Sequence, residues 1–174
     1  MSKRLPTLVR ATLRQDSTLL TRVETGLGAL EHAHRGYIEA PLRASFEDSL
    51  DIDEGLRAGR EAEHRWDYLL GHGPSRRVIA LEPHSAKTAE IDTVIRKKTA
   101  ARDQLAAHLA PGAKILHWFW VASGDVQFAD TERARRRLDQ QGIQFVGRAL
   151  LGKHLPLAPA RQSGARKRRA GGRS

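Results

Sequence analysis

The chain has 174 residues, of which 40% are hydrophobic and 29% are charged, and it carries a formal net charge of +10. This length is enough for one domain with a hydrophobic core. No run reaches the roughly 20 consecutive apolar residues of a membrane-spanning helix, the first residues lack the apolar core of a signal peptide, and the absence of cysteine excludes disulfides and zinc–thiolate or iron–sulfur sites. We therefore expect a cytoplasmic protein with no membrane partner.

The positive charge is concentrated at the two ends of the chain. Residues 1–14 hold four cations and residues 161–174 hold six, with no acidic residue in either segment, so these ten account for the whole net charge. The second segment contains a run of four cations, Arg166, Lys167, Arg168 and Arg169. Its surroundings cannot bury apolar surface, which predicts a disordered tail that either binds nucleic-acid backbones or serves only solubility. Three parts follow: a basic segment over 1–15, one α/β domain over 16–152 and a disordered basic tail over 153–174.

A helix is the first element that the hydrophobic pattern predicts. Its apolar face consists of residues spaced three or four apart, namely Leu20, Val23, Leu27, Leu30, His34 and Tyr37. Asp16 or Ser17 can cap its start, and Pro41 closes its end. Two glycines within it lower its intrinsic propensity, so its stability would have to come from packing.

Three short strands are predicted next. Alternating apolar positions over 45–52 indicate the first strand. Residues 66–70 and 77–82 are richer in strand-forming residues, and the glycine-containing turn at 71–75 joins them into a hairpin.

The remaining elements alternate between helix and strand. A long helix capped by Ser85 extends to Pro111-Gly112, and the apolar run over 114–122 is typical of a strand covered on both faces. A helix over 130–140 and a strand over 143–150 complete the domain. A strand joined through a helix to a buried strand implies a right-handed parallel crossover. We therefore predict an α/β fold with a mixed central sheet of about five strands flanked by helices.

The residues most suited to chemistry lie on the predicted hairpin. Pairing of its strands can bring the carboxylates of Asp67 and Glu82 to one edge of the sheet, where they can hold Mg²⁺ or Mn²⁺. His84 points to the same face as Glu82 in extended backbone. The structural alternative is that Asp67 faces solvent and that Glu82 pairs with Arg65 or Arg77.

In these residues and in the order of its elements, the segment over 16–150 resembles the PD-(D/E)XK nuclease superfamily. In that superfamily an aspartate on one strand, matched by Asp67, and a Glu-x-Lys motif on the next, matched at Glu82, hold the metal and activate water. His84 stands where the motif has lysine. The resemblance therefore implies that the lysine has moved to the following helix, that His84 acts on the water, or that the site is inactive.

For a relocated lysine, Lys87 in the first turn of the next helix is the preferred candidate, and Lys97 and Lys98, two to three turns further on, are less favoured. In some members a carboxylate of the first helix adds a ligand, which would be Glu24 or Glu31. Glu90, at the start of the crossover helix, is interpreted as a helix-dipole residue rather than a ligand.

Further residues are candidates for contact with nucleic acid. Trp118 and Trp120 could stack on bases, although core packing is favoured by their apolar neighbours. A row of arginines on the helix over 130–140 could guide a phosphate backbone, in particular Arg133, Arg136 and Arg137. We thus predict a bacterial metal-dependent nuclease acting on DNA or RNA, with a homodimer as a form in which it could act. The alternative is an inactive protein of the same fold that binds nucleic acid or protein.

Overall fold

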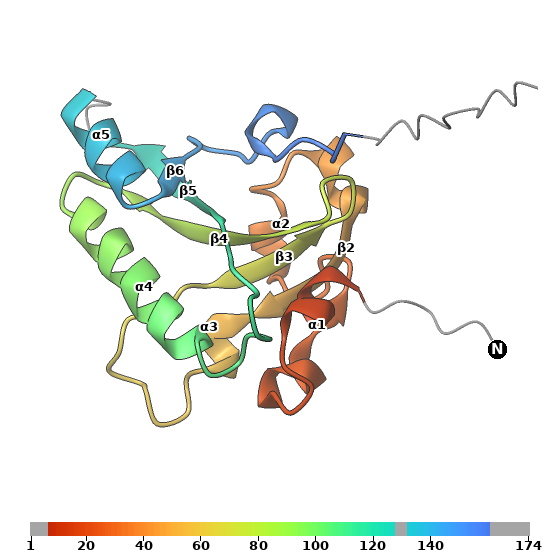
Figure 1. Cartoon of the computed structure of the whole chain (residues 1–174). Coiled ribbons are helices and arrows are strands. Elements are labelled where there is room, and N and C mark those ends of the chain that lie inside the picture. Colours follow the sequence, from red (N-terminus) through yellow and green to blue (C-terminus); the bar gives the residue numbers. More distant parts are fainter. Residues whose placement is uncertain (1–6, 128–131, 161–174) are drawn as a thin grey trace, which may run out of the picture.

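A six-stranded mixed sheet with helices packed against it forms the centre of the molecule (Figure 1). The computed structural model describes residues 7–127 and 132–160. The strands are β1 (Glu24–Thr25), β2 (Phe46–Asp51), β3 (Tyr68–His72), β4 (Arg77–Ala86), β5 (His117–Val126) and β6 (Ile143–Phe145), and they lie side by side in that order. Neighbours from β1 to β4 are antiparallel, whereas β4–β5 and β5–β6 are parallel. The predicted α/β class with a mixed sheet is confirmed, with the short β1 as an additional strand.

The helices that join these strands are of unequal length. The described α-helices are α1 (Leu8–Thr12), α2 (His32–Arg35), α3 (Ile52–Gly55), α4 (Glu90–Leu105) and α5 (Glu132–Gln140), and the 3₁₀ segments are η1 (Thr18–Arg22), η2 (Ala40–Ser45) and η3 (Gly152–His154). The 16-residue α4 connects the parallel strands β4 and β5, as the crossover prediction requires. Among the described residues, none of these helices is long and apolar enough to cross a membrane.

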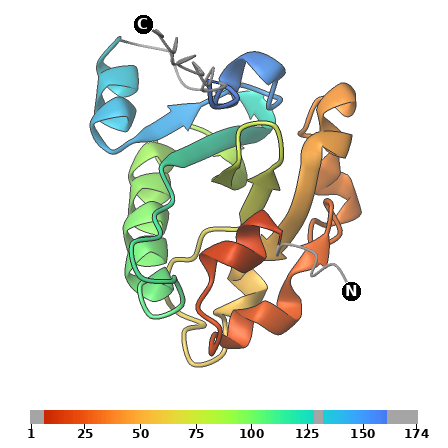
Figure 2. The same ribbon diagram turned by 45° about the vertical axis from the view of Figure 1, so that its right-hand side comes forward.

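Alternation of side chains along the strands gives the sheet two apolar faces. In β4, Val78 and Ala80 face the cluster beneath α1 and α4, whereas Ile79 and Leu81 face a second cluster. The second face is covered by the chain around α2 and by residues 146–155. Figure 2 shows α4 on one side of the sheet. The buried face of α4 therefore packs on the side of the sheet to which Val78 and Ala80 of β4 point.

The long helix predicted from Leu20 to Tyr37 is wrong. That part of the chain forms η1, β1, a turn and the four-residue α2 instead. Gly26 has a φ of +59°, a conformation that ends a helix, and a Cβ on Gly28 would lie 3.0 Å from the carbonyl oxygen of Thr25. The apolar residues at helical spacing still reach the core, but from turns. Ser17 does act as a cap, because its side chain accepts a hydrogen bond from the Leu19 N–H of η1.

Element boundaries also differ from their predictions: β3 covers 68–72 instead of 66–70, α4 ends at Leu105, and β5 covers 117–126 instead of 114–122. Two further differences concern the start of α4 and the end of β6. Ser85 belongs to β4 and does not cap α4, which begins at Glu90 after a turn. The last strand ends at Phe145, although Leu150 returns to form a single bridge with Ile38. In both places backbone pairing across the sheet decided the boundary, and local sequence pattern does not report such pairing.

The packed body begins before residue 16. Leu8 and Val9 of α1 and the following Leu13 are buried in the cluster beneath α4. The core thus includes residues that the division at 15/16 placed in a separate basic segment. The disordered tail predicted over 153–174 begins too early, because residues 152–154 form η3 and Leu155 is buried in the second cluster. Residues 161–174 of that predicted tail lie outside the described residues.

Candidate functional site

The carboxylates of Asp67 and Glu82 lie together because of strand register. Tyr68 of β3 pairs with Leu81 of β4 in the antiparallel ladder, so the residues one step further out on each strand are opposite one another. The backbone N–H of Asp67 donates a hydrogen bond to Oε2 of Glu82 at 2.9 Å. Asp67 lies on the same face as the buried Leu69, which is the face covered by α4. The predicted juxtaposition of this acidic pair is therefore present.

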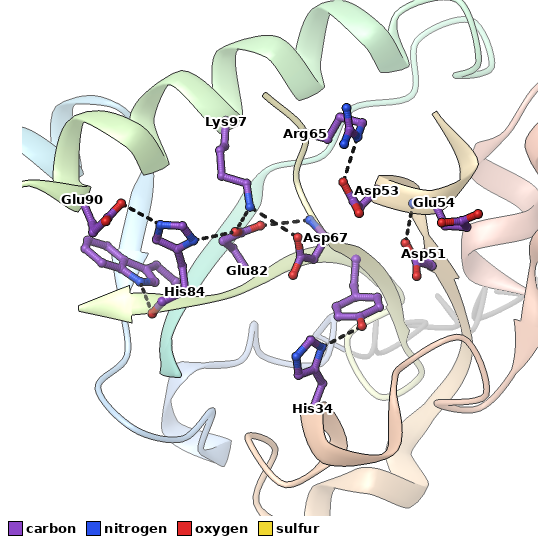
Figure 3. A network of polar contacts seen from close by, with 12 residues as sticks. His34, Asp51, Asp53, Glu54, Arg65, Asp67, Glu82, His84, Glu90 and Lys97 are labelled. Atoms are coloured by element: carbon purple, nitrogen blue, oxygen red, sulfur yellow. Dashed lines mark hydrogen bonds and ion pairs between the residues drawn. The ribbon is translucent and has the colours of Figure 1, made fainter. Parts of the chain in front are cut away.

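Lys97 of α4 completes the cluster, as Figure 3 shows. Its Nζ contacts Oε1 of Glu82 and lies 3.4 Å from Oδ1 of Asp67. The Glu82 side chain is fully buried, and the side chain of Lys97 is only 14% exposed. One ammonium group therefore bridges two carboxylates in a place largely shielded from water. The structural alternative paired Glu82 with Arg65 or Arg77, whereas Glu82 pairs with Lys97 and Arg65 pairs with Asp53.

Burial and charge set the protonation of this cluster. Burial, together with the negative charge of Glu82, raises the pKa of Asp67 from 3.8 to about 8. Although burial alone would lower the pKa of Lys97, the two carboxylates raise it overall. Near neutral pH the cluster therefore consists of an ammonium group on Lys97, its partner Glu82 and a largely protonated Asp67.

His84 lies between two carboxylates and is held from both sides. Its Nδ1 is 3.5 Å from Oε1 of Glu82, and its Nε2 is 2.8 Å from Oε2 of Glu90. The hydrogen bond with Glu82 is the largest cause that raises the pKa of His84, and the Glu90 bond adds to it. The backbone oxygen of His84 also accepts a hydrogen bond from Nε1 of Trp120 at 3.2 Å. Both ring nitrogens therefore face carboxylates, which suits a role in holding Glu82.

The lysine nearest the acidic pair is not the one preferred from the sequence. Lys87 is exposed in the turn before α4, and no described ion pair links it to Asp67 or Glu82. Lys98 contacts the backbone oxygen of Gln141 on the other flank of α4. Lys97 reaches the pair because α4 packs against β4 on the face of the sheet where Asp67 and Glu82 lie.

A sequence signal for Lys97 does exist in the buried stripe of α4. Lys97 lies three residues after Val94 and four before Ala101, and both of these are fully buried. A lysine in the middle of such a stripe requires a partner of opposite charge. The helical spacing that predicted α4 therefore also pointed to Lys97, whereas closeness in sequence to Glu82 pointed to Lys87.

Further polar groups lie around the cluster (Figure 3). Arg65 donates to Asp53 at 2.8 Å, and Nδ1 of His34 lies 2.7 Å from the hydroxyl of Tyr68. Burial raises the pKa of Asp51, although its side chain accepts a hydrogen bond from the Glu54 N–H. The carboxylates proposed from a first helix are not part of this cluster: Glu24 is exposed in β1, and the side chain of Glu31 is 73% exposed.

The aromatic residues on β5 belong to the core rather than to a surface. Trp118 and Trp120 are at most 3% exposed, and the ring of Trp118 packs edge-on against Trp66 with centroids 5.1 Å apart. Base stacking on either ring is therefore prevented by burial, as the preference for core packing predicted. Phe145 of β6 packs edge-on against Trp120 at 5.0 Å.

The arginines of α5 are exposed but not equally available. Arg136 pairs with Glu132 on its own helix at 2.6 Å, and Arg137 contacts Asp92 of α4. Arg133 is exposed and forms no ion pair within the described part of the chain. Among the three, Arg133 is best placed to meet a phosphate group. The predicted contacts at Arg166, Lys167, Arg168 and Arg169 fall outside the described residues.

The acidic pair offers hard oxygen donors but few of them. Within residues 7–127 and 132–160, no group of three or more histidine and acidic side chains is arranged to hold a metal ion. Two carboxylates suit Mg²⁺ or Mn²⁺, because such ions keep several water molecules and take further oxygens from phosphate. The ammonium group of Lys97 already lies against both carboxylates. The two carboxylates also fit a divalent cation, and Lys97 would move aside to admit it.

Comparison of the chain with family models, with curated proteins and with solved structures finds no significant match.

Proposed function

We propose that the protein is a metal-dependent nuclease that hydrolyses phosphodiester bonds in DNA or RNA. The observation that carries this proposal is the contact of Lys97 with both Asp67 and Glu82, where the start of β3 lies opposite the middle of β4. The resemblance to PD-(D/E)XK nucleases implies this set of groups, with the lysine relocated to the following helix. Lys97 takes the role for which Lys87 was preferred.

Each residue of the cluster has a distinct task in this proposal. Asp67 and Glu82 would hold Mg²⁺ or Mn²⁺, which polarises the phosphodiester and lowers the pKa of a bound water. Glu82 is fixed by the Asp67 N–H and by His84, so its carboxylate cannot rotate away. Glu90 in turn orients the ring of His84. Such supporting contacts keep a ligand in position when substrate arrives.

Lys97 is suited to donate hydrogen bonds rather than to remove a proton. The neighbouring carboxylates raise its pKa, so it remains an ammonium group at neutral pH. A group of this kind can orient the attacking water and stabilise the negative charge that develops on the phosphate oxygens. The proton lost by the water then passes to solvent, and the leaving oxygen departs with the electrons of the broken P–O bond.

The first experiment measures cleavage of labelled single-stranded DNA, double-stranded DNA and RNA with Mg²⁺, with Mn²⁺ and with EDTA. We expect cleavage of at least one substrate that EDTA abolishes. Glu82→Gln keeps the shape of the side chain and the acceptor for the Asp67 N–H, yet removes the charge. We expect it to lower the rate by about a hundredfold or more.

Two further variants separate chemistry from folding. Lys97→Met keeps an apolar stem of the same length but removes the ammonium group, so it should lose activity while its circular dichroism spectrum is unchanged. Glu54→Gln is the matched control, because Glu54 is a nearby exposed carboxylate outside the cluster. Equal loss of activity in the control would contradict the proposed role of Glu82.

Metal binding is then measured directly by calorimetric titration with Mn²⁺, with and without an oligonucleotide. Binding to the wild type but not to Glu82→Gln supports the proposal. Absence of both metal binding and cleavage, with affinity for the oligonucleotide retained, contradicts it. That outcome would favour the alternative of an inactive nucleic-acid-binding module of the same fold.

A further inference from the structure

A cavity of about 700 Å³ lies at the C-terminal half of α4. Its walls are α4, the connection from Ala106 to Leu116 and the start of β5. Figure 2 shows this connection running back beside α4 before the chain enters β5. The volume is within the range of sites for small organic molecules, about 300–1,000 Å³.

The charges around this cavity are of one sign. Four cations line it, and no acidic residue does: Arg14, Lys98, Arg102 and Lys114. Arg14 is partly neutralised by an exposed pair with Asp16 at 3.0 Å. In the part of the chain that the structure describes, Arg102 and Lys114 form no ion pair. The cavity therefore presents an uncompensated positive potential to a ligand.

Apolar side chains form part of the cavity lining beside these cations. The large apolar side chains of the lining are Leu105, Leu109, Ile115, Leu116 and Trp118. Leu116 is 57% exposed. Leu116 is one of three large hydrophobic residues that are markedly exposed in the described chain. An occupant must therefore offer apolar surface as well as negative charge.

Lys98 joins the charged and apolar parts of this cavity. Its Nζ lies 5.5 Å from the centre of the Trp118 ring and donates to the backbone oxygen of Gln141. Burial and the neighbouring charge of Arg102 lower the pKa of Lys98. An anion placed between Lys98 and Arg102 would relieve their mutual repulsion.

The cavity is separate from the acidic pair although both use α4. Lys97 and Lys98 are consecutive, so their side chains diverge by about 100° around the helix. Lys97 points to Asp67 and Glu82, whereas Lys98 points to Trp118 and the end of α5. Lys97 thus lies within the buried stripe of α4, and Lys98 lies at the edge of that stripe, beside the cavity.

We propose that this cavity binds a small organic anion with an apolar body, its acidic group at Lys98 and Arg102 and its body against Leu109 and Leu116. A nucleic-acid strand is a poorer fit, because single-strand sites rely on exposed aromatic rings for base stacking and Trp118 is only 3% exposed. The proposal is independent of the nuclease assignment and can fail without affecting it.

The test uses 1-naphthalenesulfonate as the probe, titrated calorimetrically into the full chain in buffer containing EDTA. Naphthol supplies the apolar body without the charge, and sulfate supplies the charge without the body. We expect one naphthalenesulfonate per chain and affinity at least about tenfold lower for either fragment. Equal affinity for naphthol, or no saturable binding of the sulfonate, would overturn the proposal.

Variants then locate the bound probe. Arg102→Glu and Leu116→Asp should each weaken binding by at least about tenfold. Arg96→Glu is the matched control, since it makes the same charge change at an exposed position of α4 outside the lining, and its affinity should stay within about twofold of the wild type.

Two outcomes of this series would overturn the proposal. Undiminished binding in both cavity variants would place the probe elsewhere on the molecule. Binding of a 12-nucleotide DNA strand that Arg102→Glu weakens, without any binding of naphthalenesulfonate, would identify the cavity as a nucleic-acid contact. Circular dichroism of each variant separates loss of binding from loss of fold. Lys114→Glu changes a second cation of the lining at an exposed position, so it tests the role of charge without disturbing the core.

Discussion

At the scale of single residues, the cluster combines two carboxylates with one ammonium group in a buried place. Lys97 contacts Glu82 closely and Asp67 less closely, at 3.4 Å. Glu82 also accepts the Asp67 N–H and faces His84. Burial of Asp67, together with repulsion from Glu82, raises the pKa of Asp67 to about 8. If Asp67 and Glu82 hold a divalent cation as proposed, its charge would favour the ionised form of Asp67.

Asp67→Asn should stabilise the fold at alkaline pH. Because the pKa of Asp67 is raised in the folded state, ionisation of this group disfavours folding. The variant should match the wild type near pH 4, gain stability as the pH rises towards 8 and level off above it. We expect a gain of roughly 1–3 kcal/mol in the free energy of unfolding at pH 8.

Urea denaturation at pH 4, 6 and 8 measures this effect. Asp92→Asn is the control, since Asp92 is an exposed carboxylate on α4 outside the cluster. A variant that is less stable than the wild type at pH 8 would show that Asp67 is held ionised by Lys97. The same variant should lose cleavage activity, so stability and activity change in opposite directions.

At the scale of elements, signals local in sequence predicted the structure well and signals that depend on distant contacts did not. The hairpin over 66–82 and the helical crossover follow from patterns within single segments, and both are present. The helix predicted from Leu20 to Tyr37 is absent, because turns can also bring apolar residues at this spacing into the core. Gly26, at positive φ, decided between these possibilities.

The candidate site shows the same division. Asp67 and Glu82 were found because a hairpin fixes which residues lie opposite each other. Lys97 was undervalued because its place depends on how α4 crosses the sheet, which is a tertiary property. His84 was found, but its contact with Glu90 was not, since Glu90 comes near only when the turn after β4 folds back.

Asp48 provides a test of how α1 is anchored to the sheet. Its carboxylate is 1% exposed and accepts hydrogen bonds from the N–H groups of Val9 and Arg10, at 2.9 and 3.0 Å. Gly71 leaves the room that it needs, since a Cβ there would lie 2.2 Å from Oδ1 of Asp48. Asp48→Ala leaves both donors without this acceptor and should cost about 2–4 kcal/mol of stability.

Glu47→Ala, one residue earlier, is the matched control for Asp48→Ala. Glu47 forms only a partly exposed ion pair with Arg76 at 3.2 Å, so its loss should cost less than about 1 kcal/mol. Thermal unfolding followed by circular dichroism compares the two variants. Similar midpoints for both would contradict the anchoring role of Asp48.

At the scale of the whole molecule, the excess of positive charge lies in the two end segments, while the chain between them is balanced. On the described surface, Arg133 of α5 is the exposed arginine of the predicted row without an ion pair. If nucleic acid is the substrate, these cations would hold its backbone while the acidic pair carries out the reaction. Affinity and cleavage should then depend on separate parts of the chain.

Arg133→Gln should therefore weaken binding of an oligonucleotide and leave the fold unchanged. Loss of one phosphate contact lowers the slope of log affinity against log salt by about one. Fluorescence anisotropy at several salt concentrations measures that slope. Arg137→Gln is the comparison, because Arg137 already contacts Asp92 and should affect the slope less. Deletion of residues 161–174 should lower it further, and an unchanged slope would contradict a role for these cations.

The attachment of Lys97 to α4, while both carboxylates belong to the sheet, bears on how the protein would lose activity on heating. Opening of α4 alone separates the charges of the cluster and admits water to it, even if the sheet persists. The free energy needed to disrupt the cluster is then that of opening one helix, which is smaller than the free energy of unfolding the whole domain. We expect thermal inactivation to occur at a lower temperature than the melting of the sheet. Substitutions that strengthen the packing of α4 on the sheet would therefore raise the inactivation temperature more than substitutions that enlarge the core.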